Sequence, residues 1–576
     1  MTAIGVWAPG AARVRAVVAS DSVELGAGPD GWWSGADAAP GTDYAFLLGD
    51  DDEPLPDPAS RWQPHGVHGA SRVYDEAAYP WGDVAWRGRE LPGGVIYELH
   101  VGTFTPGATF DTAAERLDHL VSLGITHVEL LPVNAVNGVW NWGYDGVGWY
   151  AVHEPYGGPD GLKRFVDACH RRGLAVVLDV VYNHLGASGN YLPRFGPYLT
   201  SGRNTWGGLV NVEQPQVRRF VIENALMWLR DFHVDALRLD AVHALHDSTP
   251  THVLAELSTA VDALSVEFGR PLTLIAESDL NDPVMITPRS AGGYGLAAQW
   301  DDDVHHALHA LLTGETQGYY CDFGSLQALA KVFTSAFFHD GTYSTFRGRP
   351  HGKPVERYTT PGHRFVVCLQ NHDQVGNRAV GDRLPEIASA GLLRVGAVLL
   401  LTSPFTPMLW MGEEWAASTR WPFFTSHPEP ALAELTGKGR VEEFATHGWD
   451  VAQMIDPQDP AAYRTAILDW SELAAPAHAE MLDLYRRLIA LRSAEPDLAD
   501  PDLSLVEVDY DEDARWLVVH RGAWRVVVNL AATEQFVPVA ATEVVLATSA
   551  AEVCDGAVQL GAQSAAIVRG ANPATA

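Results

Sequence analysis

The sequence has few cysteines, and they are not arranged for a disulfide scaffold or a metal site. Among 576 residues only 4 are cysteine, namely Cys169, Cys321, Cys368 and Cys554, and no Cys-x-x-Cys pair occurs. Widely spaced cysteines of this kind are usually reduced residues of a protein core. We therefore expect no bound metal, and we expect a cytoplasmic protein.

The sequence also lacks any segment apolar enough to cross a bilayer or to direct export. The longest apolar stretch, Val395 to Leu401, is far shorter than the roughly 18 residues that a membrane span needs. The first ten residues have neither the basic region nor the apolar region of a signal peptide. We expect no contact with a membrane.

Positive charge is scarce as well. The chain has 39 Lys and Arg against 72 Asp and Glu, a formal net charge of −33. Such a surface repels phosphate backbones, which argues against nucleic acid as a partner. Hydrophobic residues make up 47% of the chain, enough for a large globular core. The length exceeds one ordinary domain and allows three or four units, or two if one is an α/β barrel.

Both ends of the chain have the pattern of antiparallel β-structure. Residues 1–90 contain short alternating runs such as IGVWAP, RVRAVVA and YAFLLG, separated by Gly, Pro and Asp turns. This pattern is typical of a β-sandwich. Residues 496–576 alternate again in LSLVEV, RWLVVHR and WRVVVNL, which predicts a C-terminal β-domain, also a sandwich.

The middle of the chain, residues 91–495, predicts a TIM barrel. Seven apolar strands alternate with amphipathic helices: VIYELHV, THVELLPV, LAVVLDVVY, VDALRLDA, LTLIAES, RFVVCLQ and TPMLWMG. A weaker eighth strand is expected near LAAQW. Near-continuous apolar strands indicate a parallel sheet that is buried on both faces, and this length favours a (β/α)₈ barrel. Thr112 and Glu115 fit a capping box at the first helix. No GxGxxG motif follows the first strand, which argues against a dinucleotide fold.

Polar side chains follow four of the predicted strands at their C-terminal ends, the active-site face of such a barrel. Strand three ends with Asp179, Asn183 and His184, strand four with Arg238, Asp240 and His243, strand five with Glu277 and Asp279, and strand seven with Asn371, His372 and Asp373. Any one of them could be a helix cap or a satisfied structural residue. Capping alone does not explain four such strand ends together.

Two of the carboxyl groups suit glycoside cleavage, which needs one protonated and one ionised carboxyl. Arg238 lies two residues before Asp240 and should keep it ionised, as a nucleophile requires, although the two could also form an ordinary ion pair on one strand face. Glu277 follows the apolar run LTLIA, which predicts a raised pKa and the role of general acid and base.

The segments DVVYNH, LRLDAVH, IAESD and QNHD resemble the four sequence regions of the α-amylase family of glycoside hydrolases in order and spacing. The resemblance implies that Asp240 is the nucleophile, Glu277 the acid/base and Asp373 the stabiliser of the transition state. The implied substrate-binding residues around the cleaved glucose are Arg238, His184, His372 and Asn371, with Tyr144 stacking on the sugar.

Within this family, IYELHVGTFTP, LIAESDLNDP and MGEEW resemble the branch that acts on malto-oligosyltrehalose. That resemblance implies retaining hydrolysis of the α-1,4 bond next to the terminal trehalose, without a cofactor. It also implies malto-oligosyltrehalose synthase as the pathway partner that supplies the substrate. The insertion after strand three, at about residues 183–212, is short, so the calcium-holding domain of secreted α-amylases is expected to be reduced. His243 and Asp279 are predicted on the rim of the leaving-group subsites, although Asp279 could instead cap the following turn.

Other readings stay open at this point. A glycogen branching enzyme shares the N-terminal module and the IYELHVG segment, but it transfers the glucan to a sugar acceptor rather than to water. An ordinary α-amylase-like hydrolase is a second alternative, and a catalytically inactive glucan-binding protein is a third. Nothing in the sequence indicates an oligomeric state.

Overall fold

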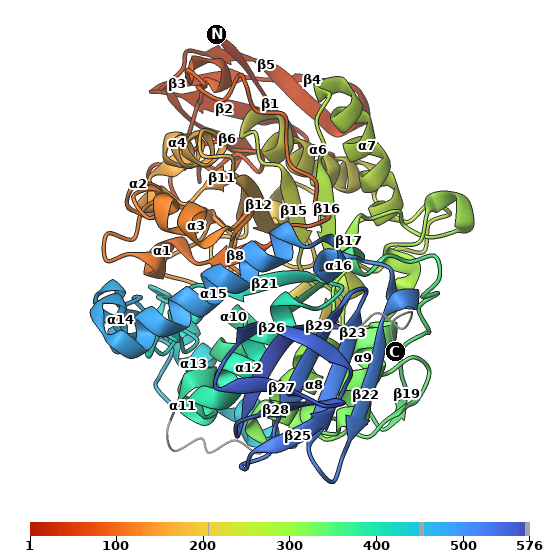
Figure 1. Ribbon diagram of the computed structural model, residues 1–576. Coiled ribbons are helices and arrows are strands. Elements are labelled where there is room, and N and C mark those ends of the chain that lie inside the picture. Colours follow the sequence, from red (N-terminus) through yellow and green to blue (C-terminus); the bar gives the residue numbers. More distant parts are fainter. Residues whose placement is uncertain (205–206, 448–453, 571–576) are drawn as a thin grey trace.

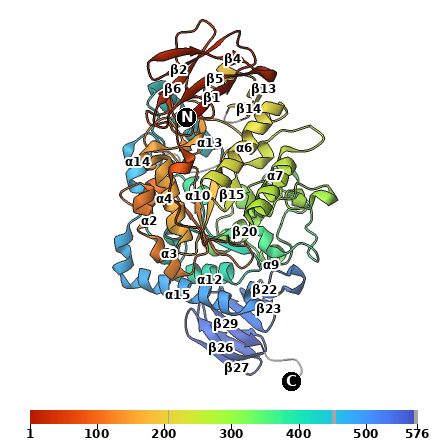
Figure 2. The same ribbon diagram turned by 90° about the horizontal axis from the view of Figure 1, so that it is seen from above.

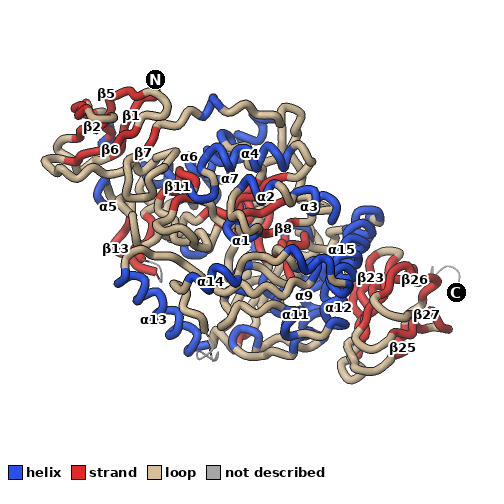
Figure 3. Tube along the Cα trace, turned by 90° about the vertical axis from the view of Figure 1, so that its left-hand side faces the viewer, coloured by secondary structure: helices blue, strands red, loops and turns tan. Residues whose placement is uncertain are grey.

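The computed structural model describes residues 1–204, 207–447 and 454–570 and confirms the predicted fold class. A barrel surrounded by helices lies in the centre (Figure 1). The N-terminal strands and the C-terminal β-domain lie at opposite ends of the molecule, as Figures 2 and 3 show. No helix within the described ranges is long and apolar enough to span a bilayer.

Eight parallel strands close the barrel, in the order β12-β15-β16-β17-β20-β21-β8-β9. Their bounds are Ile96–Leu99 (β8), His127–Leu130 (β9), Ala175–Val180 (β12), Ala236–Leu239 (β15), Thr273–Ala276 (β16), Ala298–Trp300 (β17), Phe365–Cys368 (β20) and Thr406–Trp410 (β21). The weak eighth strand is therefore real. At three residues, β17 is shorter than each of the other seven.

The main barrel helices are α3 (Leu117–Leu123), α4 (Gly158–His170), α6 (Pro215–Asp231), α7 (Val253–Phe268), α8 (Asp302–Thr313), α9 (Leu326–Ser335), α12 (Ala390–Leu401) and α15 (Pro476–Ala494). Helix α4, for example, buries the apolar residues Leu162, Phe165 and Val166, whereas α12 is buried on all sides from Val395 to Leu401. The predicted capping box is wrong by one turn. Helix α2 (Phe110–Ala114) begins at Thr109, whose hydroxyl accepts from the N–H of Thr112 while the Thr112 hydroxyl accepts from the N–H of Thr109.

The two flanking units are antiparallel. At the N-terminus, β1 (Thr2–Trp7), β5 (Trp32–Ala38) and β4 (Gly26–Ala27) form one sheet, and β3 (Asp21–Glu24), β2 (Val14–Val18), β6 (Asp43–Leu48) and β7 (Ser71–Arg72) form a second. At the C-terminus, β22 (Glu507–Asp511), β23 (Trp516–Arg521), β24 (Trp524–Asn529), β29 (Ser564–Gly570) and β26 (Ala541–Ala547) form a five-stranded sheet. This sheet is accompanied by β25 (Gln535–Pro538), β28 (Ala557–Leu560) and β27 (Ala551–Cys554).

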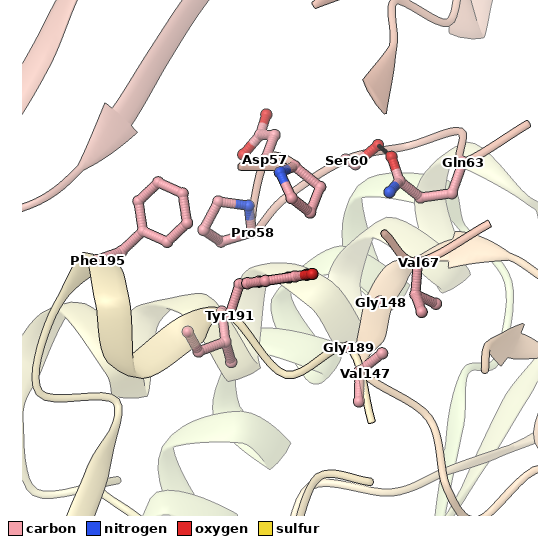
Figure 4. A pocket seen from close by; sticks show the side chains of 12 residues that line it. Asp57, Pro58, Ser60, Gln63, Val67, Val147, Gly148, Gly189, Tyr191 and Phe195 are labelled. Carbon is pink, nitrogen blue, oxygen red and sulfur yellow. Dashed lines mark hydrogen bonds between the residues drawn. The ribbon is translucent and has the colours of Figure 1, made fainter. Parts of the chain in front are cut away.

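In its described part, the insertion after β12 contains a short helix, α5 (Leu192–Phe195), and the hairpin strands β13 (Leu199–Asn204) and β14 (Gly207–Val210). Figure 4 shows a small cavity between this insertion and the linker from the N-terminal unit, with Tyr191 below Pro58 and with Phe195 and Val67 on opposite sides. The cavity volume of about 30 Å³ is only two to three times the roughly 10–15 Å³ that a single water molecule needs. This cavity is therefore too small for a sugar ring.

The linker before β8 crosses the N-terminal end of the barrel and is held there by a buried ionic cluster. His170, at the end of α4, lies between Asp83 of the linker (2.8 Å) and Asp235 just before β15 (2.9 Å). Asp83 also pairs with His233 at 2.8 Å. Trp86 of the linker stacks on the His170 ring at 4.6 Å. We call Asp83, His170, His233 and Asp235 the linker clamp.

Candidate active site

The barrel interior changes from apolar to charged toward the C-terminal ends of its strands. The apolar part consists of Ile96, Val177, Ala236, Ile275, Ala298, Val366 and Met408. Because alternate strand residues share a face, the inward positions two residues further along are Glu98, Asp179, Arg238, Glu277, Trp300, Cys368 and Trp410. We call Glu98, Glu129, Asp179 and Arg238 the charged layer; each of these four residues is at most 3% exposed.

Arg238 lies at the centre of the site and contacts three carboxyl groups. Its Nη1 donates to Asp179 at 2.8 and 3.0 Å and to Oδ1 of Asp240 at 2.8 Å. Its Nη2 lies 3.6 Å from Oε2 of Glu277. The guanidinium also lies over the Trp300 ring, 4.3 Å from its centroid. One buried cation therefore holds the two predicted catalytic carboxyls, Asp240 and Glu277, side by side.

The backbone after β15 brings Glu277 next to Asp240. Ala241 has a φ of 41°, a left-handed conformation that costs about 1 kcal/mol or more outside glycine. In this conformation the N–H of Ala241 donates to Oε2 of Glu277, and the N–H of Val242 donates to the Glu277 carbonyl at 3.0 Å. Burial raises the pKa of Glu277, with Asp240 and Asp373 adding to the rise and Arg238 opposing it. A raised pKa suits a general acid.

Asn183 and His184 hold neighbouring residues in place. The amide of Asn183 donates to Oδ2 of Asp240 at 2.6 Å and to the Asp240 carbonyl at 3.0 Å. The ring nitrogens of His184 contact the Asn183 side-chain oxygen (2.6 Å) and the Tyr144 carbonyl (2.8 Å). His184, predicted as a sugar ligand, thus contacts the protein through both nitrogens.

Tyr144 and His372 form a stacked pair beside Asp179. The Tyr144 hydroxyl donates to Oδ2 of Asp179 at 2.6 Å, and Nε2 of His372 lies 2.7 Å from the same hydroxyl. The two rings are 5.2 Å apart and inclined by 18°. His372 is buried, whereas Tyr144 is only partly buried, so Tyr144 is the member of the pair that can meet a sugar.

Asn371 and Asp373 lie at the start of helix α10 (His372–Gly376), after β20. The side-chain oxygen of Asn371 accepts from the N–H of Gln374 at 2.8 Å, which makes Asn371 the helix cap. Asp373 is 39% exposed and lies 3.4 Å from Nε2 of His372. The exposed carboxyl of Asp373 is therefore open to ligand, whereas Asn371 has a structural task.

His243 and Asp279, both expected on the rim of the leaving-group subsites, lie close to each other, and Asp279 also contacts a third residue that the sequence did not reveal. Nε2 of His243 is 3.8 Å from Oδ1 of Asp279, and Nη1 of Arg347 donates to Oδ2 of Asp279 at 3.1 Å. The alternative role of Asp279 as a turn cap is wrong, because Ser278 accepts from the N–H of Leu280 and Asp282 caps the next helical turn.

Asp302 is a second residue that sequence reasoning missed. It begins α8 directly after β17, and burial raises its pKa to about 7, with Glu277 and Asp373 adding to the rise. Its place after the weak strand LAAQW was the available signal.

No group of His, Cys, Asp and Glu suited to a metal ion occurs among the residues described.

The fold and the converging carboxyls define a glycosidase with an α-amylase barrel. The family profile described as Alpha amylase, catalytic domain, matches residues 107–196, and the profile described as Domain of unknown function (DUF3459) matches residues 501–567. A solved structure of an amylase-like protein from Salmonella typhimurium superimposes with a TM-score of 0.90 at 36% identity, covering 98% of this chain and 97% of that one.

Two curated relatives narrow the assignment. The malto-oligosyltrehalose trehalohydrolase of Rhizobium sp. (strain M-11) is 56% identical over 538 residues, which cover 91% of this chain and 90% of the relative. The enzyme of the same name from Mycobacterium tuberculosis is 52% identical over 576 residues and covers 99% of both chains. The chain belongs to the malto-oligosyltrehalose trehalohydrolase family.

Proposed function

We propose that this protein hydrolyses the α-1,4 bond next to the terminal trehalose of malto-oligosyltrehalose, with release of trehalose and retention of configuration. The observation that carries the mechanism is the contact of Arg238 with both Asp240 and Glu277. A retaining glycosidase needs an ionised nucleophile close to a protonated acid. The arrangement supplies a cation at Asp240 and a raised pKa at Glu277.

The reaction proceeds in two steps. In the first, Glu277 donates its proton to the glycosidic oxygen, Asp240 forms a bond to the anomeric carbon, and the trehalose unit leaves. In the second, Glu277 takes a proton from a water molecule whose oxygen bonds to the anomeric carbon as the bond to Asp240 breaks, and the shortened malto-oligosaccharide is released. Asp373 holds the hydroxyls beside the reacting carbon, and Tyr144 stacks on the sugar ring. No cofactor takes part in either step.

The preference for trehalose is assigned to the polar group His243, Asp279 and Arg347. His243 follows Asp240 by three residues, Asp279 follows Glu277 by two, and the Asp279 side chain is 40% exposed. Buried or half-buried polar groups reject ligands that leave them without a partner. The α,α-1,1 link turns the second glucose ring of trehalose away from the direction that the second ring of maltose takes. The hydroxyls of the turned ring would pair with these three side chains, whereas those of maltose would not.

The cellular context follows from the same chemistry. The substrate requires an enzyme that makes the terminal trehalose linkage, a malto-oligosyltrehalose synthase. A cytoplasmic location is supported by the four cysteines, all of which are free thiols.

One assay tests the proposal against its alternatives. The purified protein is incubated with malto-oligosyltrehalose and, separately, with plain malto-oligosaccharide, and products are followed by chromatography and by NMR of the new anomeric proton. Trehalose with an initially α-configured reducing end is the expected result. Branched glucan would indicate a branching enzyme, faster cleavage of plain malto-oligosaccharide an α-amylase, and no product a glucan-binding protein. Asp240→Asn serves as the inactive control.

A further inference from the structure

Glu98 on the first barrel strand has no role in the two-step mechanism, yet it makes the shortest contact to His372. Its Oε1 lies 2.5 Å from Nδ1 of His372, and its Oε2 accepts from the His372 backbone N–H at 3.0 Å. Both residues are 1% exposed. The carboxylate therefore fixes the His372 ring through two bonds to one residue.

The other ring nitrogen of His372 also faces an acceptor. The Tyr144 hydroxyl has one hydrogen and donates it to Asp179 at 2.6 Å, so its oxygen accepts from Nε2 of His372 at 2.7 Å. A carboxylate on one side and an accepting hydroxyl on the other require a hydrogen on each ring nitrogen. This geometry describes an imidazolium.

We propose that Glu98 is a positioning residue: its carboxylate keeps His372 doubly protonated, and the imidazolium in turn orients the Tyr144 ring and hydroxyl at the sugar subsite. The chain of contacts runs from Glu98 through His372 and Tyr144 to Asp179 and ends at Arg238. The functional readout of this inference depends on the proposed function, because Tyr144 is there assigned to the substrate.

The charges around His372 agree with this arrangement. Burial alone would lower the pKa of His372, but Asp373 and Glu98 outweigh burial and raise it to about 9, with Arg238 opposing the rise. Three aromatic rings complete the surroundings, with centroids 5.9 to 6.5 Å from the imidazole: Trp142, Trp300 and Trp410. The neighbouring His100, also buried, has a pKa lowered to about 3, chiefly by burial, and stays neutral.

A second acid beside Glu98 provides a matched control. Glu129 is the direct cross-strand partner of Glu98 on β9 and is equally buried. Among the described residues, neither carboxyl oxygen of Glu129 has a hydrogen-bond partner. Burial, with Glu98 and Asp179 adding to it, raises the pKa of Glu129 well above its ordinary value, against Arg238 and His372. These causes favour the neutral form of Glu129, so an amide in its place is the matched control for the amide at Glu98.

The first experiment is a pH profile of kcat/KM for wild type, Glu98→Gln and Glu129→Gln. Loss of an adjacent opposite charge lowers a histidine pKa by about 1–3 units. Glu98→Gln is therefore expected to approach the wild-type kcat/KM near pH 5.5. Above the lowered pKa of His372, its kcat/KM should fall by up to about tenfold per pH unit, mainly because KM rises. Glu129→Gln is expected to keep the wild-type profile. A loss in Glu98→Gln that is the same at every pH would overturn the inference.

The second experiment needs neither activity nor a folded Glu98 variant. Long-range ¹H–¹⁵N spectra of ¹⁵N-histidine-labelled wild type at pH 8, assigned with His372→Asn, are expected to show both His372 ring nitrogens protonated. A neutral His372 at pH 8 would overturn the inference. If wild type instead releases no trehalose while its His372 is doubly protonated, the proposed function fails and the role of Glu98 as the charge partner stands.

Discussion

The linker clamp allows a quantitative prediction about how the N-terminal unit is fastened to the barrel. The His170 side chain is fully buried and bonds two carboxylates at 2.8 and 2.9 Å. A hydrogen bond to a charged group contributes about 1.5–3 kcal/mol. In His170→Gln, Asp83 still forms its ion pair with His233, and Asp235 still forms its ion pair with Arg270. Because neither carboxylate is left without a partner, the lower end of the range applies to each of the two lost hydrogen bonds. We expect local destabilisation of about 3 kcal/mol.

The measurement is hydrogen exchange of peptides that cover residues 79–95, because a chain of three units need not unfold in a single step. A loss of about 3 kcal/mol corresponds to roughly a hundredfold faster exchange. The exposed pair His65 and Asp43, at 3.1 Å, supplies the control: His65→Gln is expected to change exchange less than about fivefold. Equal protection in wild type and His170→Gln would refute the reasoning.

The pH dependence of the same experiment has a definite sign. Burial alone would lower the pKa of His170, but hydrogen bonds to Asp235 and Asp83 raise it above its ordinary value. A group whose folded pKa is raised stabilises fully below its unfolded pKa of about 6.5, and this stabilisation disappears as pH rises through the folded value. The difference between wild type and His170→Gln should therefore shrink as pH rises. A difference that grows with pH would contradict the assigned charge.

Four predictions concern the catalytic end. Asp240→Asn should fold normally and lose at least about a thousandfold in turnover; higher residual trehalose release would disprove the nucleophile assignment. A crystal structure should place the Asp240 and Glu277 carboxyls about 5–5.5 Å apart, whereas about 9 Å would indicate inversion. Tyr144→Ala should mainly raise KM, and unchanged kinetics would make Tyr144 a packing residue. Asp279→Ala and His243→Ala should each lower kcat/KM for malto-oligosyltrehalose about ten- to a hundredfold more than for plain malto-oligosaccharide; equal losses would assign both residues to the chemistry or the fold.

Most of the fold could be predicted because strands buried on both faces leave near-continuous apolar runs. The strand β17 was the weakest prediction, since three residues with Gln299 in the middle give little periodic signal. The position of the first helix cap was wrong by one turn because Thr109 and Thr112 use two hydroxyls in place of the expected threonine–glutamate pair.

The site could be predicted only in part, because the positions of strand ends show which residues are neighbours and little more. Strand ends identify Asp240 and Glu277 as neighbours, but not the direction in which a polar side chain faces. Asn371 therefore stood among the expected ligands, although its oxygen caps α10. Arg347 lies 68 residues beyond Asp279, in a segment without periodicity, and only folding brings it there.

The charged layer also limits how this enzyme can be made more heat-resistant. Replacing buried charges by well-packed apolar side chains is often neutral or stabilising in other proteins, and laboratory selection for thermal tolerance alone would favour such replacements. Here they would remove Arg238, the only cation that touches both Asp240 and Glu277 in the described part of the chain. Substitutions that raise the thermal stability of this enzyme without loss of turnover therefore have to be made at the apolar end of the barrel and in the flanking sheets.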